Sequence, residues 1–304
     1  DLPPGQRLTL VMPRPRESTI SLVITQHLED AIVLRNVRRS LVRAAHVQLL
    51  QLARTDERLA GHLDGMAVSG EHGARAITAA LETLGVGEVF VAAVSAIEQR
   101  DASQIDKLLL LAEADPLAAT GLASAFGWVS AQQLRGLLTP WMSGTAPMHK
   151  WAALNACALH RVDPGIALVA WLGDADVRVR ARALRAAAEV ARRDLLPACL
   201  DHLKDDSPEC EAYATWSAVL LGDRSAALDA LRTLALSPSP WRSGLLALAL
   251  FTADTQTTQA LMKSLTTANA DQRTVMRAAG WAGDVHVVPW LLQHMTDDRL
   301  ARVV

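Results

Sequence analysis

Turn-forming residues recur along this chain at a nearly constant interval, and this regularity restricts the possible folds more than any other feature. The turn clusters are centred on Asp115, Ala146, Asp176, Asp206, Pro238 and Ala270, and a last one lies at Asp297-Asp298. The steps between the first six are 31, 30, 30, 32 and 32 residues. Unrelated loops would not keep such a period, whereas a fixed interval of about 20–50 residues is typical of stacked repeats. The sequence therefore predicts a repeat array.

Each interval contains a second, shorter break that divides it into two helical segments. These breaks fall at Arg100-Asp101, Gly127-Trp128, Asp163-Pro164-Gly165, Arg193-Asp194, Gly222-Asp223, Asp254-Thr255 and Gly283-Asp284. In one second segment, Leu196, Cys199, Leu200 and Leu203 follow the i, i+3, i+4, i+7 spacing of an apolar helix face. A single hairpin cannot bury that face, but stacked hairpins bury one continuous core. With three Phe and one Tyr available for sheets, we predict an all-α, right-handed α-solenoid.

The ends of the chain differ from the regular array. Residues 1–19 carry four prolines among arginines and are expected to form an extended N-terminal arm. Residues 20–43 and 44–69 are expected to form two longer helices, which end at Gly70 and make residues 20–72 an N-terminal helical cap. Residues 73–304 are predicted to be the repeat array. Its last six residues begin a new first helix, so the array is expected to be incomplete at the C-terminus.

Charge and cysteine usage limit the partners and the compartment. Thirty basic and 32 acidic residues give a formal charge of −2, which argues against nucleic acid and anionic lipid as partners. The longest uncharged stretch, residues 116–134, contains too many polar residues for a membrane span, so no membrane insertion is expected. Cys157, Cys199 and Cys210 lie far apart in apolar helical segments, which predicts buried free thiols in a reducing compartment.

The sequence lacks the residue patterns that usually support catalysis or cofactor binding. The chain has no G-x-x-x-x-G-K loop and no H-E-x-x-H motif. The paired acids Asp205-Asp206 and Asp297-Asp298 fall where helix N-caps are needed, which is a simpler role than metal binding. The sequence therefore predicts no catalytic residue, no metal site and no cofactor.

One helix carries a row of arginines that allows two interpretations. Arg178, Arg182 and Arg185 share one helix face, and Arg180 and Arg192-Arg193 lie nearby. A basic surface of this kind can grip nucleic-acid phosphates, as in helical DNA glycosylases. Alternatively, these arginines bond to the turn aspartates of adjacent repeats. Local acids offset the charge, and the second interpretation is preferred.

Candidate partner-binding residues lie on the second helices, which are expected to line the concave face of the solenoid. These positions are polar and poorly suited to burial: Gln132, Arg135, Asp201, Lys204, Asp229 and Arg232. Their mixed charge fits a folded protein surface better than a polyanion, although a plainly solvated face would look the same. The eight Trp are expected mostly to fill gaps between layers, with a few left for binding.

Two sets of motifs carry a resemblance to known families. The segment DADVRVRARALRAA at 174–187 is similar to the HEAT-repeat signature, which also occurs in the bilin-lyase type of HEAT repeat. The stretches QHLEDA at 26–31, DERLAGHLDGM at 56–66, ACALHRVDPG at 156–165 and GWAGD at 280–284 together resemble an uncharacterised proteobacterial HEAT-repeat family. The genes of that family often lie near type VI secretion clusters.

The resemblance implies a function that residue spacing alone does not give. It implies HEAT-like two-helix repeats in a bacterial cytoplasmic protein that handles a secreted effector or toxin, as an immunity protein or as an adaptor or chaperone. That family supplies no catalytic residues to carry over to this chain. The leading hypothesis is a non-catalytic protein-binding scaffold. The alternative is a HEAT-scaffold enzyme or nucleic-acid binder, similar to a DNA glycosylase or a bilin lyase.

Overall fold

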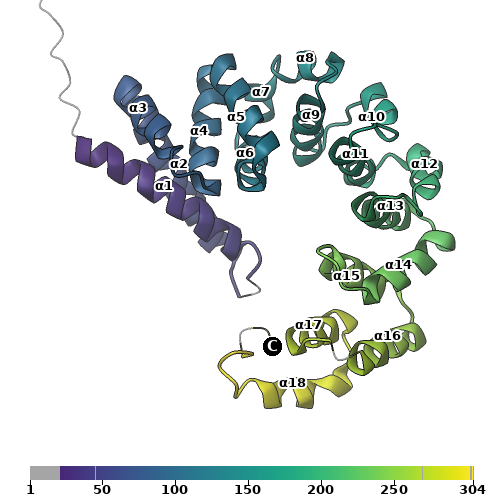
Figure 1. The fold of residues 1–304 in the computed structure, drawn as a ribbon. Helices are drawn as coiled ribbons and strands as arrows, with labels where there is room; N and C mark the ends of the chain where they lie inside the picture. The colour runs from purple at the N-terminus through teal and green to yellow at the C-terminus, as the bar shows by residue number, and fades with distance from the viewer. Residues whose placement is uncertain (1–20, 45, 269, 302, 304) are drawn as a thin grey trace, which may run out of the picture. The chain divides into compact units, whose positions relative to one another are not determined.

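A computed structural model describes residues 21–44, 46–268, 270–301 and 303, and within them the protein is entirely helical. Eighteen α-helices and two short 3-10 helices follow one another, with no strand among these residues (Figure 1). The predicted all-α solenoid is confirmed. The expected N-terminal arm, residues 1–19, lies outside the described residues. In the part of the chain that the structure describes, no helix is long and apolar enough to cross a membrane.

The chain divides into two compact units, and the first comprises the described residues up to Val129. Its helices are α1 (Ser21–Leu41), α2 (Leu49–Val68), α3 (Gly70–Ala80), α4 (Val86–Gln99), α5 (Ala102–Ala114) and α6 (Pro116–Trp128). The almost wholly apolar helix α4 lies between α1 and α6. Glycines allow this close packing, because a Cβ at Gly87 would lie 2.7 Å from Ile32 of α1 and one at Gly121 would lie 2.7 Å from the Val86 carbonyl.

The two expected cap helices are present, with shifted ends. The first ends at Leu41, and the second begins only at Leu49, after a short connection. Gly70 follows the end of α2 as predicted, but it also begins α3 with a φ of +53°, a value that suits glycine. The proposed boundary between residues 72 and 73 therefore falls inside α3, and the division into cap and array stays a prediction.

The second unit, from Ser130 onward, is a series of helical hairpins. Its first helices are α9 (Pro147–Leu159), α11 (Val177–Glu189), α13 (Pro208–Leu221), α15 (Arg242–Thr252) and α17 (Gln272–Ala282). Its second helices are α7 (Ala131–Leu134) with α8 (Leu138–Ser143), α10 (Ile166–Trp171), α12 (Leu196–Asp201), α14 (Ala226–Leu236), α16 (Thr255–Thr267) and α18 (Val288–His294). The 3-10 helices Arg193–Leu195 and Val285–Val287 lead into α12 and α18.

Turn residues start the helices as the sequence predicted. The side chains of Asp115, Asp176, Ser207 and Asp271 accept hydrogen bonds from backbone N–H groups in the first turns of α6, α11, α13 and α17. The break expected at Gly127-Trp128 comes slightly later, because α6 continues through Trp128.

The bend inside several hairpins contains a residue in the left-handed conformation. Gly222 and Gly283 occupy this position after α13 and α17, with φ of +121° and +65°. Arg100, Arg161 and Ala191 adopt φ of 55° to 57° after α4, α9 and α11. For an L-residue with a Cβ, this conformation is disfavoured by about 1 kcal/mol. The stacked layers therefore impose the bend even where the residue is not glycine.

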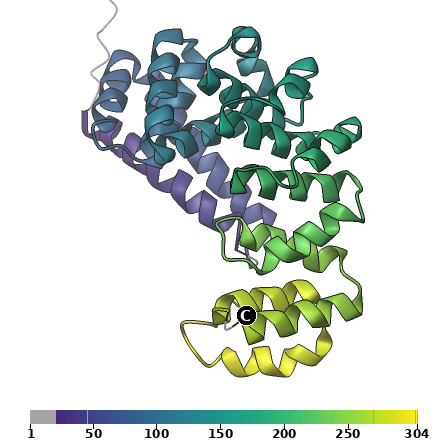
Figure 2. The ribbon, with the colours of Figure 1, turned by 45° about the vertical axis from the view of Figure 1, so that its right-hand side comes forward.

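Within the second unit the first helices lie along the inner side of the curve that its layers follow. Figure 1 shows α9, α11, α13, α15 and α17 inside and α10, α12, α14 and α16 outside, and Figure 2 shows the same succession of layers from another direction. Each first helix packs directly on the next. Buried alanines such as Ala183, Ala186 and Ala214 allow this close approach, and Ser217 Oγ donates to the Leu184 carbonyl at 2.7 Å. The expectation that second helices line the concave face is therefore wrong for this unit.

Candidate protein-binding surface

The six predicted binding residues all lie on or beside second helices of the second unit. Gln132 is in α7 and Arg135 follows it; Asp201 ends α12 and Lys204 lies in the next turn; Asp229 and Arg232 are in α14. All are exposed except the half-buried Arg232. The structure brings together Asp229 and Arg232, whose Oδ1 and Nη1 atoms are 3.1 Å apart. Because these elements lie on the outer side of the curve, the six residues do not form a concave surface, and their role in binding stays a prediction.

Arg135 also lines a cavity of about 360 Å³ at the end of α9. Its walls are mostly apolar, with Leu134, Leu138 and Met142 on one side and Cys157 on the other. A mainly apolar hollow with a cation among its lining residues can receive an apolar side chain of a partner. The predicted surface near α7 therefore includes a mainly apolar hollow.

A ladder of ion pairs connects consecutive layers on either side of α11. We call Lys150–Asp174 and Arg180–Asp205 the ion-pair ladder. Lys150 Nζ lies 2.7 Å from Asp174 Oδ2, and the Arg180 guanidinium donates to both carboxylate oxygens of Asp205, at 3.0 and 3.2 Å. Arg180 Nη1 also donates to the Asp174 carbonyl at 2.7 Å. Arg180 thus bonds to a turn aspartate of the next repeat, as the preferred interpretation of the arginine row proposed.

The carboxylates of the ion-pair ladder have low pKa values. Burial alone would raise the pKa of Asp205, but hydrogen bonds from Arg180, the Ser207 amide and His202 outweigh it and lower the pKa to about 2. At Asp174 burial is likewise outweighed, and the bond from Lys150 helps to lower the pKa. Both aspartates also accept a backbone N–H two residues later, which shapes the turn before each first helix.

The other arginines of α11 are also paired with acids. Arg182 Nη1 lies 2.7 Å from Glu189 Oε2, and Arg182 Nε donates to Asn155 Oδ1 of α9 at 2.9 Å. Arg185 Nε lies 2.9 Å from Glu189 Oε1. Burial lowers the pKa of Arg182, which has only about a tenth of its side chain exposed. The arginine row is therefore largely neutralised by its own surroundings.

Aromatic and arginine side chains from three consecutive first-helix layers form a continuous strip, which we call the aromatic–arginine band: Arg185, Tyr213 and Trp241. The Arg185 guanidinium carbon lies 5.4 Å from the centre of the Tyr213 ring. Tyr213 in turn meets Trp241, which precedes α15, in an edge-to-face contact at 6.4 Å between ring centres. Tyr213 and Trp241 are half-buried and Arg185 is exposed. Trp, Tyr and Arg are the residues most enriched at binding hot spots.

Tyr213, the only tyrosine in the chain, was not among the residues predicted to bind a partner. Of the eight tryptophans, expected mostly to fill gaps between layers, Trp141 and Trp171 are buried in the core and the other six are half-buried. No tryptophan in the described residues is fully exposed. The tryptophans therefore both pack between layers and leave part of their rings accessible.

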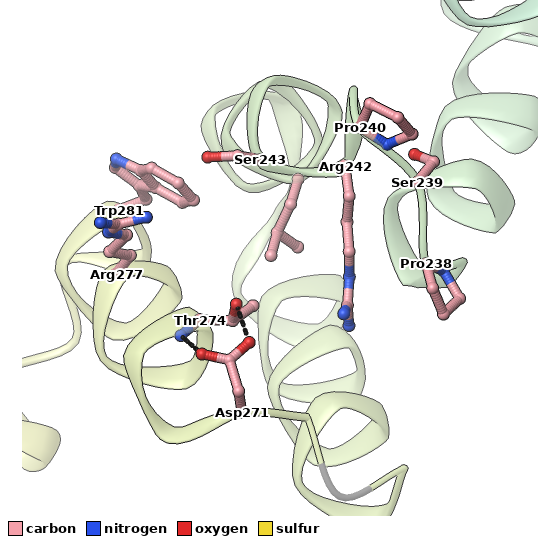
Figure 3. Close-up of a pocket in the computed structure, with 10 residues that line it drawn as sticks. Pro238, Ser239, Pro240, Arg242, Ser243, Asp271, Thr274, Arg277 and Trp281 are labelled. Atoms are coloured by element: carbon pink, nitrogen blue, oxygen red, sulfur yellow. Dashed lines mark hydrogen bonds between the residues drawn. The ribbon is translucent and has the colours of Figure 1, made fainter.

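A cavity of about 290 Å³ lies between α15, α17 and the turn at 238–240 (Figure 3). We call it the α15–α17 cavity. Arg242 extends along one side of it, and Arg277 and Trp281 lie together on the opposite side. Asp271 also lines the cavity, but Thr274 already donates to its two carboxylate oxygens, at 3.0 Å from the backbone N–H and 2.5 Å from the hydroxyl. These Thr274 bonds, with Arg242 nearby, lower the pKa of Asp271.

The three cysteines are free and buried, as predicted. Burial raises the pKa of Cys199 to about 12, so this thiol stays protonated at neutral pH. The described parts of the chain contain no cluster of three or more His, Cys, Asp or Glu side chains that could hold a metal ion.

Comparison with known proteins agrees with this architecture. No curated protein matches the chain. Residues 166–250, from the start of α10 into α15, match the family model of HEAT repeats, a stretch that includes α11 with its arginines and the Arg180–Asp205 pair. The period, the paired helices and this match together support a HEAT-repeat protein.

Proposed function

We propose that this chain is a non-catalytic scaffold that binds one folded protein partner. The aromatic–arginine band carries this proposal, because it presents Arg185, Tyr213 and Trp241 from three consecutive layers of the second unit. Large, partly exposed aromatic side chains supply contact area at low entropic cost, and the stacked helices hold them in place. HEAT repeats are common protein-interaction scaffolds, which supports the same class of function.

The partner we propose is a bacterial secreted effector or toxin, bound in the cytoplasm without a cofactor. The four motifs that resemble the family encoded near type VI secretion clusters support this choice. The chain would then act either as an immunity protein, which neutralises its toxin, or as an adaptor or chaperone, which delivers the effector for export. These roles differ in outcome, because an immunity protein rescues cells that express the toxin and an adaptor is required for its export.

The alternative function is a HEAT-scaffold enzyme or nucleic-acid binder, like a DNA glycosylase or a bilin lyase. The arginines that suggested phosphate binding are mostly already paired with carboxylates. Arg180, Arg182 and Arg185 each have a carboxylate oxygen within 3.0 Å, and Arg192 lies 2.6 Å from Asp194 Oδ2. A cation that is already paired must give up its partner before it can bind a phosphate. We therefore favour the protein-binding scaffold.

Co-purification with the product of the neighbouring gene tests the proposal. We expect a stable complex whose dissociation constant rises at least about tenfold on Tyr213→Ala, because removing a hot-spot aromatic side chain weakens binding by about 1.4 kcal/mol or more. Arg232→Ala and Asp201→Ala test two of the six predicted residues, those on α14 and α12, in the same assay.

Two outcomes would contradict the proposal. One is a shift of duplex DNA by the purified protein at physiological salt, or cleavage of a damaged base, because either result supports the alternative function. The other is a complex unaffected both by Tyr213→Ala and by the outer-side variants. If only the outer-side variants weaken the complex, the scaffold stands and the binding surface moves to α12 and α14.

A further inference from the structure

The geometry points to the α15–α17 cavity as a docking site for an acidic side chain of the protein partner, flanked by an apolar or aromatic residue. Two cations, Arg242 and Arg277, line it against one acid, Asp271. The inference deepens the proposed function, on which it rests, by naming the chemistry of the partner at one site.

Arg277 is the cation most available to a ligand. It is exposed on α17, and among the described residues no hydrogen bond or ion pair involves it. Arg242 is only weakly engaged, since its Nε donates to the Ala235 carbonyl at 3.4 Å. Among the described residues Arg242 forms no hydrogen bond or ion pair with Asp271, although its charge helps to lower the pKa of that carboxyl. The cavity therefore holds guanidinium donors that its own acid does not satisfy.

A second observation indicates an absent polar partner. Ser239 is one of the residues that line the cavity, and its buried Oγ has no hydrogen-bond partner within the described residues. A buried hydroxyl without a partner costs about 1–3 kcal/mol. An oxygen atom from a ligand that reaches this hydroxyl can accept its hydrogen bond. The cavity thus has donors at its edge as well as on its two sides.

Charge and size favour a carboxylate on a protein over other occupants. Two arginines against one acid attract an anion, and a guanidinium binds a carboxylate through paired, charge-assisted hydrogen bonds. Trp281 and Leu246 give the lining an apolar part that suits a neighbouring hydrophobic residue. At about 290 Å³ the cavity lies at the small end of ligand sites, about 300–1,000 Å³, which fits one or two side chains.

A titration with blocked dipeptides on the full chain tests the inference without a known partner. Ligand-observed NMR would compare phenylalanine–glutamate with the isosteric phenylalanine–glutamine dipeptide. We expect the glutamate compound to bind roughly tenfold more tightly, the difference that one charge-assisted hydrogen bond supplies. Arg277→Gln should remove this preference, and Arg242→Gln should reduce it. Arg273→Gln, at an exposed arginine of α17 that does not line the cavity, is the matched control and should leave the preference unchanged.

Several results would overturn the inference. Equal binding of the two dipeptides would show that the cavity does not select a carboxylate, and a preference that survives Arg277→Gln would place the selective site elsewhere. Displacement of the glutamate compound by equimolar inorganic phosphate would assign the cavity to phosphate groups. Because these measurements need no partner, failure here is distinguishable from failure of the proposed function. If the product of the neighbouring gene did not co-purify with the chain but the preference for the glutamate dipeptide remained, only the proposed partner would be rejected.

Discussion

The layers around α11 and the layers around α17 share one hairpin design but use their charges differently. In the first region the cations of the ion-pair ladder, Lys150 and Arg180, are bonded to turn aspartates of the following repeat. In the second region Arg242 makes one long hydrogen bond to a carbonyl, and Arg277 lies exposed beside a cavity. The comparison indicates that one region uses its arginines to hold layers together, whereas the other has cations available for a ligand.

Equivalent positions in the repeat show how this difference arises. Lys150 and Arg180 each occupy the fourth position of a first helix, and the same position is Glu211 in α13, Leu245 in α15 and Val275 in α17. Without a cation at that position, an acid in the following turn has no ladder partner. The turn position of Asp174 and Asp205, three residues before the first helix, is correspondingly Ser239 before α15. The ladder therefore ends where the α15–α17 cavity begins.

The largest expected effect is a loss of stability when the ion-pair ladder is broken, and its absence would contradict the comparison. Asp205→Asn keeps an oxygen for the Ser207 amide but leaves Arg180, whose side chain is 16% exposed, without a counter-charge. We expect the free energy of unfolding in urea to fall by about 2–3 kcal/mol. Asp229→Asn breaks the exposed pair with Arg232 and should change it by less than about 1 kcal/mol. Equal effects of the two variants would mean that the ladder does not stabilise the layers.

Acid should weaken the same region through Asp205. Its pKa is about 2 in the folded protein and near 3.8 in the unfolded chain, so folding favours the ionised form. The stabilisation is complete above about pH 4 and is lost as the pH falls through about 2, by roughly 2 kcal/mol. Circular dichroism during acid titration should show a steeper loss of stability for the parent than for Asp205→Asn. Parallel curves would contradict the assigned pKa.

The smallest expected effect concerns Arg277, in the region around α17. Arg277→Ala removes an exposed side chain that bonds to none of the described residues, so the free energy of unfolding should change by less than about 0.5 kcal/mol. Lys150→Met, which breaks the other pair of the ion-pair ladder, is the control and should destabilise by about 1 kcal/mol. If Arg277→Ala destabilises as much as Lys150→Met, Arg277 is structural and the comparison fails.

The sequence predicted the elements whose causes are local. A turn aspartate followed by an apolar helical stripe is sufficient to start a helix, so the caps at Asp115, Asp176 and Asp271 could be predicted from neighbouring residues. The period then gave the number and order of the hairpins. The Gly127-Trp128 break was misplaced because glycine can also lie within a helix; α6 ends at its C-cap Val129, and Ser130 caps the start of α7.

The sequence did not predict features that depend on several layers at once. Small side chains such as Ala183 and Ala214 let neighbouring first helices pack closely on the inner side of the second unit. This effect depends on several repeats together, so the sequence of one repeat does not predict it. The α15–α17 cavity joins Ser239 to Trp281, which are more than one repeat apart. Only the spacing of Arg277 and Trp281, one helical turn apart on α17, could have suggested this site in advance.

The left-handed bends at Arg100, Arg161 and Ala191 have a consequence for how such an array can change over time. Each bend concentrates its conformational penalty in one solvent-accessible residue, and glycine removes that penalty, as Gly222 and Gly283 do in equivalent layers. A substitution at one bend can therefore raise or lower the stability of one layer without altering the side chains of the proposed binding surface. Substitutions at the bends could therefore offset the stability cost of changes in the proposed binding surface.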